Sequence, residues 1–74
     1  MTLKDLKIGK SAVVKKLDGD GPIKRRIMDM GITKGVTVKV ENIAPLGDPM
    51  DLTVRGYHLS IRKADAKNII VDNI

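Results

Sequence analysis

The chain has 74 residues, the size of one small domain, and it contains no cysteine, which excludes disulfide bonds and thiolate metal sites and suits a reducing cytoplasm. Lys and Arg outnumber Asp and Glu by 14 to 9, and the net charge of +5 favours an acidic protein, an anionic membrane surface or a nucleic acid as partner. Neither a secretory signal nor an apolar run of the ~20 residues that cross a bilayer is present, so we expect a single cytoplasmic domain over residues 1–74.

The first part of the chain suggests a lead-in segment over residues 3–10 and a strand over residues 11–17. The expected apolar anchors of the lead-in are Leu3, Leu6 and Ile8. Alternation in the strand is imperfect and leaves open which of two sets faces inward: Ala12 with Val14, or Val13 with Leu17.

Residues 22–30 are the only segment that clearly predicts an α-helix. Asp20 is a plausible N-cap, Pro22 suits the first helical turn, and Gly31 can take the positive φ that ends a helix. One stripe of the helix is apolar and must pack on a sheet: Ile23, Ile27 and Met30.

After the helix, the hydrophobic pattern changes to the period of a strand. Val36, Val38 and Val40 share one face, and a bulge is expected near Glu41 and Asn42 because the next apolar residue changes parity. Two prolines and a glycine then predict a loop over residues 44–49.

Residues 50–61 predict a tight hairpin, because the parity of the apolar residues flips across Arg55 and Gly56. A two-residue turn there pairs three sets of apolar residues: Val54 with Tyr57, Leu52 with Leu59, and Met50 with Ile61. The other face then pairs Thr53 with His58 and Asp51 with Ser60. The turn type stays open, since Arg55 is an unusual first turn residue.

The remaining residues suggest one helical turn over 63–67 and a closing strand over 68–72. Five short strands and one inserted helix predict an all-β (mostly β) fold, a small barrel, because closure removes strand edges that would otherwise aggregate.

Several sequence blocks, in order, resemble the ferrous iron transport protein A (FeoA) family, from about Leu17 to Val71. The blocks span residues 25–35, 44–49, 55–63 and 64–71. The resemblance implies an SH3-like β-barrel and a non-enzymatic accessory role in bacterial ferrous iron uptake. The implied partner is the cytosolic, GTPase-bearing portion of the membrane transporter. The module also resembles a C-terminal domain of iron-dependent repressors. Lys34 departs from the proline that many relatives have there.

The predicted partner-binding residues lie on the 44–49 loop and the helix: Leu46, Met28, Met30, Arg25 and Arg26. Leu46 is a large apolar residue on a short rigid loop, which suits a docking anchor, although it could instead fold back to cap the barrel. Met28 and Met30 could form an adaptable contact surface, with packing of Met28 under a loop as the alternative. The two arginines could orient an acidic partner or remain a solvated face.

No catalytic, cofactor or metal residues are predicted. His58 is the only histidine and is expected to face solvent, and neither Ser11 nor Ser60 has an assignable base. The rival functions are a basic nucleic-acid-binding barrel, which the single aromatic Tyr57 disfavours, and a metal-dependent regulatory SH3-like module, which lacks ligands.

Overall fold

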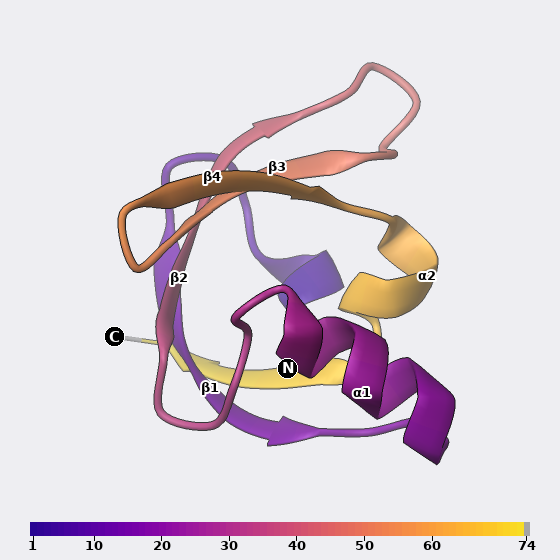
Figure 1. Ribbon diagram of the computed structural model, residues 1–74. Coiled ribbons are helices and arrows are strands. Elements are labelled where there is room, and N and C mark those ends of the chain that lie inside the picture. Colours follow the sequence, from indigo (N-terminus) through magenta and orange to yellow (C-terminus); the bar gives the residue numbers. More distant parts are fainter. Residues whose placement is uncertain (74) are drawn as a thin grey trace.

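Five antiparallel strands curve around one apolar interior in the computed structural model, which describes residues 1–73 (Figure 1). The elements in chain order are a 3-10 helix, five strands and two α-helices: η1 (Leu3–Asp5), β1 (Ser11–Leu17), α1 (Gly21–Asp29), β2 (Thr37–Ile43), β3 (Met50–Val54), β4 (Tyr57–Ile61), α2 (Lys63–Ala66) and β5 (Ile69–Asn73). The predicted mostly-β fold with one helix inserted after the first strand is confirmed.

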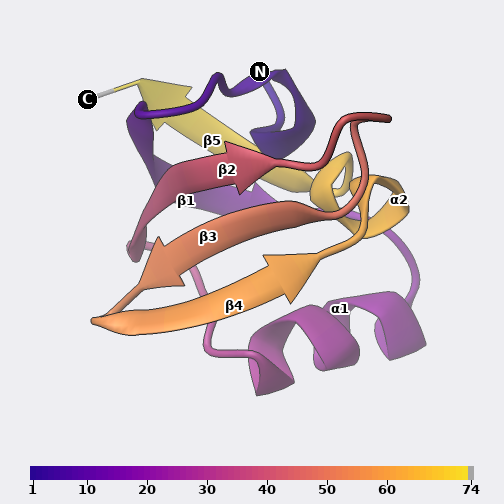
Figure 2. The ribbon, with the colours of Figure 1, turned by 90° about the horizontal axis from the view of Figure 1, so that it is seen from above.

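The two edge strands of the sheet, β4 and β5, differ in whether another segment covers them. The strand order is β4-β3-β2-β1-β5, so the hydrogen-bonded ladder does not join β4 to β5, and α1 and α2 fill the space between them (Figure 2). The N-terminal segment covers the edge of β5, where Thr2 bridges Ile70 and the Val71 N–H donates to the Met1 carbonyl at 3.0 Å. The edge of β4 has no such strand beside it among residues 1–73.

Helix α1 begins and ends almost where the sequence predicts. Asp20 is the N-cap, and its Oδ1 accepts a hydrogen bond from the Ile23 N–H at 3.0 Å, which satisfies one of the free amides of the first turn. Pro22 lies in that turn. The helix stops at Asp29, one residue early, and Gly31 follows the cap with a φ of +89°, a conformation that glycine adopts without strain.

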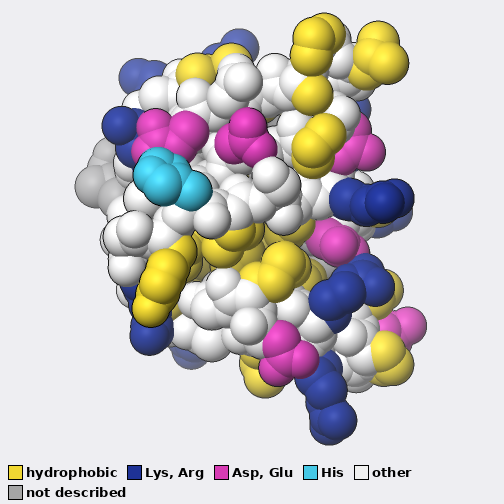
Figure 3. Space-filling view, turned by 45° about the horizontal axis from the view of Figure 1, so that its top comes forward, with side chains coloured by type: hydrophobic (Ala, Val, Ile, Leu, Met, Phe, Trp, Pro, Cys, Tyr) yellow, Lys and Arg dark blue, Asp and Glu magenta, His cyan; other side chains and the backbone are white. Residues whose placement is uncertain are grey.

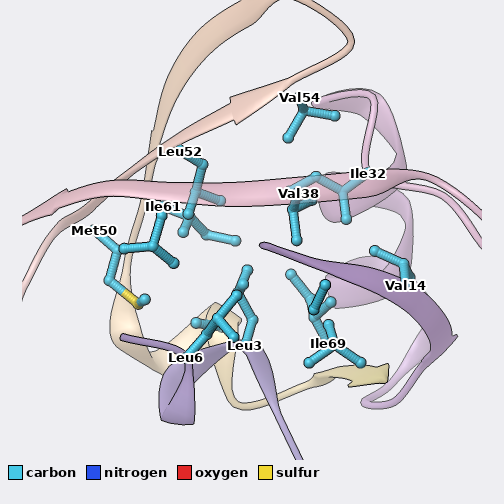
Figure 4. Packing of buried hydrophobic residues seen from close by; sticks show 14 of the residues in the cluster. Leu3, Leu6, Val14, Ile32, Val38, Met50, Leu52, Val54, Ile61 and Ile69 are labelled. Carbon is cyan, nitrogen blue, oxygen red and sulfur yellow. The ribbon is translucent and has the colours of Figure 1, made fainter. Parts of the chain in front are cut away.

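The interior is built from residues of every strand, α1, η1 and α2 (Figure 4). On β1 the structure decides between the two predicted sets: Ala12 and Val14 are buried, and Val13 and Leu17 are only partly buried. Ile27 is the fully buried residue of α1. The prediction that Ile8 anchors the lead-in is wrong, because Ile8 is 54% exposed in the turn before β1.

Strand β2 and the β3–β4 hairpin follow the predicted pattern. The register of β2 on β3 shifts between Val40 and Asn42, where the bulge is expected. Val54 pairs with Tyr57, and all predicted hairpin pairs are confirmed. The turn residues Arg55 and Gly56 have φ of +53° and +82°, which is a type I′ geometry that matches the twist of the strands.

Candidate docking surface

Leu46 lies at the tip of a loop that is fixed at its base. The Ala44 N–H donates to the Pro49 carbonyl at 3.1 Å, the Gly47 N–H donates to the Ala44 carbonyl at 2.7 Å, and Asp48 Oδ1 accepts from the Lys63 N–H at 2.9 Å. The Leu46 side chain is 94% exposed. The alternative that Leu46 folds back to cap the barrel is therefore wrong.

Helix α2 connects this loop to α1. Asp48 of the loop accepts from the backbone at the first residue of α2, and Asp65 of α2 accepts a hydrogen bond from the guanidinium of Arg26 on α1. The Asp65 side chain is 13% exposed and that of Arg26 is 59% exposed. This chain of contacts places the loop, α2 and α1 on one side of the molecule.

A groove runs between α1 and β4 on that side, with a volume of about 410 Å³. The groove is lined by Arg26 from α1, Met30 at the C-cap of α1, Ser60 and Ile61 from β4, and Ala64 and Asp65 from α2, with Arg62 at the junction of β4 and α2. Figure 3 shows a hollow of this kind, with hydrophobic side chains along it and basic side chains beside it.

The structure divides the predicted helix residues into two sets. Arg26 and Met30 are four residues apart, share one face of α1 and line the groove. Arg25 and Met28 are three residues apart on another face, and Arg25 lines a separate hollow beside Pro22. Met28 is 49% exposed, so the alternative that it packs under a loop is wrong.

A polar network covers the outer face of β2, β3 and β4. The Thr53 hydroxyl donates to Glu41 Oε2 at 2.6 Å and lies 3.2 Å from His58 Nδ1. Because that hydroxyl has one proton, which Glu41 accepts, the second contact requires a proton on His58 Nδ1. The hydrogen bond from Thr53, and then the nearby charges of Lys39 and His58, hold the pKa of Glu41 below its ordinary value of 4.5.

His58 is exposed, as predicted. The Ser60 hydroxyl on the same face donates to Asp51 Oδ1 at 2.7 Å. The described residues contain no group of three or more His, Cys, Asp or Glu side chains placed to hold a metal ion. The arrangement of this face is that of a satisfied polar surface.

The Arg26–Asp65 ion pair and the groove behind it are features that sequence reasoning missed. The two residues are 39 positions apart, and no local pattern connects them. The parity of β4 gave one signal, since it placed Ile61 on the inner face next to the exposed Arg62.

Helices long and apolar enough to cross a bilayer are absent from residues 1–73. Residues 1–73 match the family described as FeoA domain. A curated relative from Porphyromonas gingivalis, an Fe(2+) transport protein A/Fe(2+) transporter FeoB fusion protein, is 38% identical over all 74 residues, and the chain spans only 9% of its length.

Solved structures agree in fold. The FeoA-like protein from Clostridium acetobutylicum is 39% identical with a TM-score of 0.94, and the match covers all of this chain and 86% of that one. Stenotrophomonas maltophilia FeoA, described as a prokaryotic SH3 domain protein complexed with zinc, is 33% identical over 97% of this chain and 89% of that one, with a TM-score of 0.78. A manganese-dependent transcriptional repressor shares the fold alone, with 15% identity, a TM-score of 0.90, and coverage of all of this chain and 41% of that one. The chain therefore belongs to the FeoA family and has its SH3-like fold.

Proposed function

We propose that this protein is a cytoplasmic accessory and regulatory component of bacterial ferrous iron uptake that binds the cytosolic, GTPase-bearing portion of the ferrous iron transporter. Two relatives support the proposal. In the P. gingivalis protein the FeoA part is joined to the FeoB transporter in one chain. The S. maltophilia protein is described as a candidate activating factor for ferrous iron transport.

The FeoA family is a family of non-enzymatic accessory domains, in line with the prediction that the chain is not an enzyme. The proposed mechanism is therefore docking. The energy of docking has to come from apolar side chains that lose water on contact and from charges that orient the partner.

The observation that carries the proposal is the exposure of Leu46 on its fixed loop. A large apolar side chain that is 94% exposed gains the full free energy of burial when a partner covers it. Because hydrogen bonds already order the loop at Ala44 and at Asp48, little conformational entropy is lost on binding. Leu46 is thus the proposed anchor.

The helix contributes in two ways. Met28 and Arg25 are exposed on one face and are proposed to make direct contact with the partner. Met30 and Arg26 line the groove, and Arg26 also fixes α1 against α2 through Asp65. With a net charge of +5, the chain would approach an acidic partner faster than a neutral one, and this effect weakens with salt.

The test is a calorimetric titration of the purified chain with the transporter's cytosolic portion. Binding of the wild-type chain should weaken at least about tenfold in Leu46→Glu, because a charge then replaces a buried anchor. Ile8→Glu is the matched control, since Ile8 is an exposed apolar residue in the turn before β1. Absence of binding by the wild-type chain would refute the proposed partner. Equal binding by both variants would refute the anchor.

A further inference from the structure

Strand β4 is an edge strand, and its own residues carry none of the usual devices that block pairing. Natural proteins usually block such edges with Lys, Pro, a bulge or a covering segment. Residues 57–61 are Tyr-His-Leu-Ser-Ile, with no Lys, Arg, Asp, Glu or Pro. The register of β4 on β3 runs without a bulge, whereas the other edge, on β5, is covered by the N-terminal segment.

The backbone groups at this edge belong to two residues. In an antiparallel hairpin with a two-residue turn, the pair next to the turn is hydrogen-bonded, and bonded and non-bonded pairs then alternate. Tyr57, Leu59 and Ile61 therefore bond to β3. The N–H and C=O groups of His58 and Ser60 point outward, and no backbone hydrogen bond to any other described segment satisfies them.

The space next to this edge can receive a chain segment. It is the groove of about 410 Å³ between β4 and α1, and its walls include the half-buried Met30 and the buried Ile61. Side chains of an added strand alternate between two faces. One set would lie toward these apolar walls and the other set would lie beside His58 and Ser60.

The charged residues around the groove determine which sign of charge the bound segment should carry. Asp65 is already paired with Arg26, and its side chain is mostly buried. Arg62 is exposed where the groove meets α2, and it makes no ion pair with any other residue in the range 1–73. A carboxylate at the end of the segment nearest α2 would pair with Arg62, away from the carboxylates of Glu41 and Asp51 that lie beside His58 and Ser60.

We infer that β4 binds an extended acidic peptide segment of the partner protein as an added strand, through the backbone groups of His58 and Ser60 and with Arg62 as its charge contact. This mode of recognition gives affinity through main-chain hydrogen bonds and selectivity through alternate side chains. The inference rests on the proposed function only for the source of the segment, which would be the transporter's cytosolic portion.

The first arm of the test uses a short synthetic peptide of alternating Glu and Val, with a peptide of alternating Lys and Val as its match. The Glu peptide should shift the amide NMR signals of His58 and Ser60, and the Lys peptide should bind about tenfold more weakly. Arg62→Glu should reverse this preference, and Lys7→Glu, a charge reversal at another exposed position, should leave it unchanged. Equal binding of the two peptides, or an unchanged preference in Arg62→Glu, would overturn the inference.

The second arm removes one backbone donor. Ser60→Pro deletes the outward N–H without removing a bond to β3, which an edge strand tolerates, and should weaken the Glu peptide about tenfold. Ser60→Ala keeps the N–H and loses only the hydroxyl bond to Asp51, so it should bind as the wild type does. Equal binding by the two variants would contradict strand addition. An unchanged amide spectrum for β1 to β3 verifies the fold of both.

The third arm separates this inference from the proposed function. In a complex with the transporter's cytosolic portion, the amides of His58 and Ser60 should exchange with solvent more slowly, while those of Tyr57 and Leu59, already bonded, should change little. A complex that forms with the first two amides unprotected would overturn the inference and leave the proposed function intact. If the peptide binds at β4 but the transporter's cytosolic portion does not bind at all, strand addition stands and the proposed function is refuted.

Discussion

The guanidinium of Arg26 on α1 donates a hydrogen bond to the carboxylate of Asp65 on α2, and this contact joins the two helices that fill the gap between the sheet edges. Asp65 keeps only 13% of its side chain exposed, whereas Arg26 keeps 59%. The pair is therefore asymmetric: the carboxylate depends on the arginine far more than the arginine depends on the carboxylate.

Removal of the arginine should destabilise the fold. Arg26→Ala leaves a mostly buried carboxylate without its charged donor, and we expect a loss of about 1–2 kcal/mol in the free energy of unfolding. Urea unfolding measures this change. Arg25→Ala, one position away in the same helix and without an ion pair to the described residues, should stay within about 0.5 kcal/mol of the wild type. Equal effects in the two variants would show that the pair is not structural.

The N-cap of α1 gives a second stability prediction. Asp20→Ala removes the acceptor for the Ile23 N–H and should lower the free energy of unfolding by about 1 kcal/mol. Asp29→Ala is the control, because a negative charge in the last turn opposes the helix dipole and its removal should be neutral or slightly stabilising. Thermal unfolding followed by circular dichroism distinguishes the two. A cap variant as stable as the wild type would contradict the assignment.

A substitution in the hairpin turn should increase the stability of the fold. Arg55 is the only residue other than glycine with a positive φ among those described, and Arg55→Asn replaces it with a residue that tolerates this conformation. We expect a gain of about 0.5–1 kcal/mol in the free energy of unfolding. Arg55→Lys keeps the strain and should change nothing, so denaturant unfolding of both variants tests the turn type. A destabilised Asn variant would argue against type I′.

The Glu41–Thr53 contact predicts a pH effect with a definite sign. The hydrogen bond from Thr53 is the main reason that the pKa of Glu41 is lowered, so Thr53→Val should raise this pKa toward 4.5 and Thr53→Ser should keep it low. A group with a depressed folded-state pKa stabilises the fold above its unfolded pKa, and this contribution is lost as the pH falls through the folded value. Carbon NMR titration of the Glu41 carboxyl measures the shift. The same pKa in both variants would contradict the proposed cause.

Sequence patterns predicted most of this fold because the decisive signals are local. The parity flip at Arg55 and Gly56 determined the hairpin register, and Asp20 with Gly31 marked the ends of α1. The prediction that Ile8 is buried was wrong, because an apolar residue beside a turn glycine has no periodic partner to show which way it faces. A small barrel was predicted from the number and length of the strands, but the pattern did not show that β4 and β5 would be the edge strands.

The candidate site was less predictable, because it depends on contacts between distant residues. The exposure of Leu46 could not be decided from the sequence, since a loop leucine can cover the barrel or face solvent with equal ease. The groove depends on Arg26 and Asp65 meeting across 39 positions, and on the free edge of β4 facing α1. Helical spacing alone, however, separates Arg26 and Met30 from Arg25 and Met28.

In-cell photo-crosslinking tests the central claim, docking through the loop tip, most directly. Benzoylphenylalanine in place of Leu46 should form a covalent adduct with the ferrous iron transporter on irradiation, and the same probe in place of Ile8, another exposed apolar residue, should not. Mass spectrometry of the adduct identifies the partner and the contacted segment. An adduct with the transporter's cytosolic portion from position 46 alone is the predicted result; no adduct with the transporter, or equal adducts from both positions, would contradict the account.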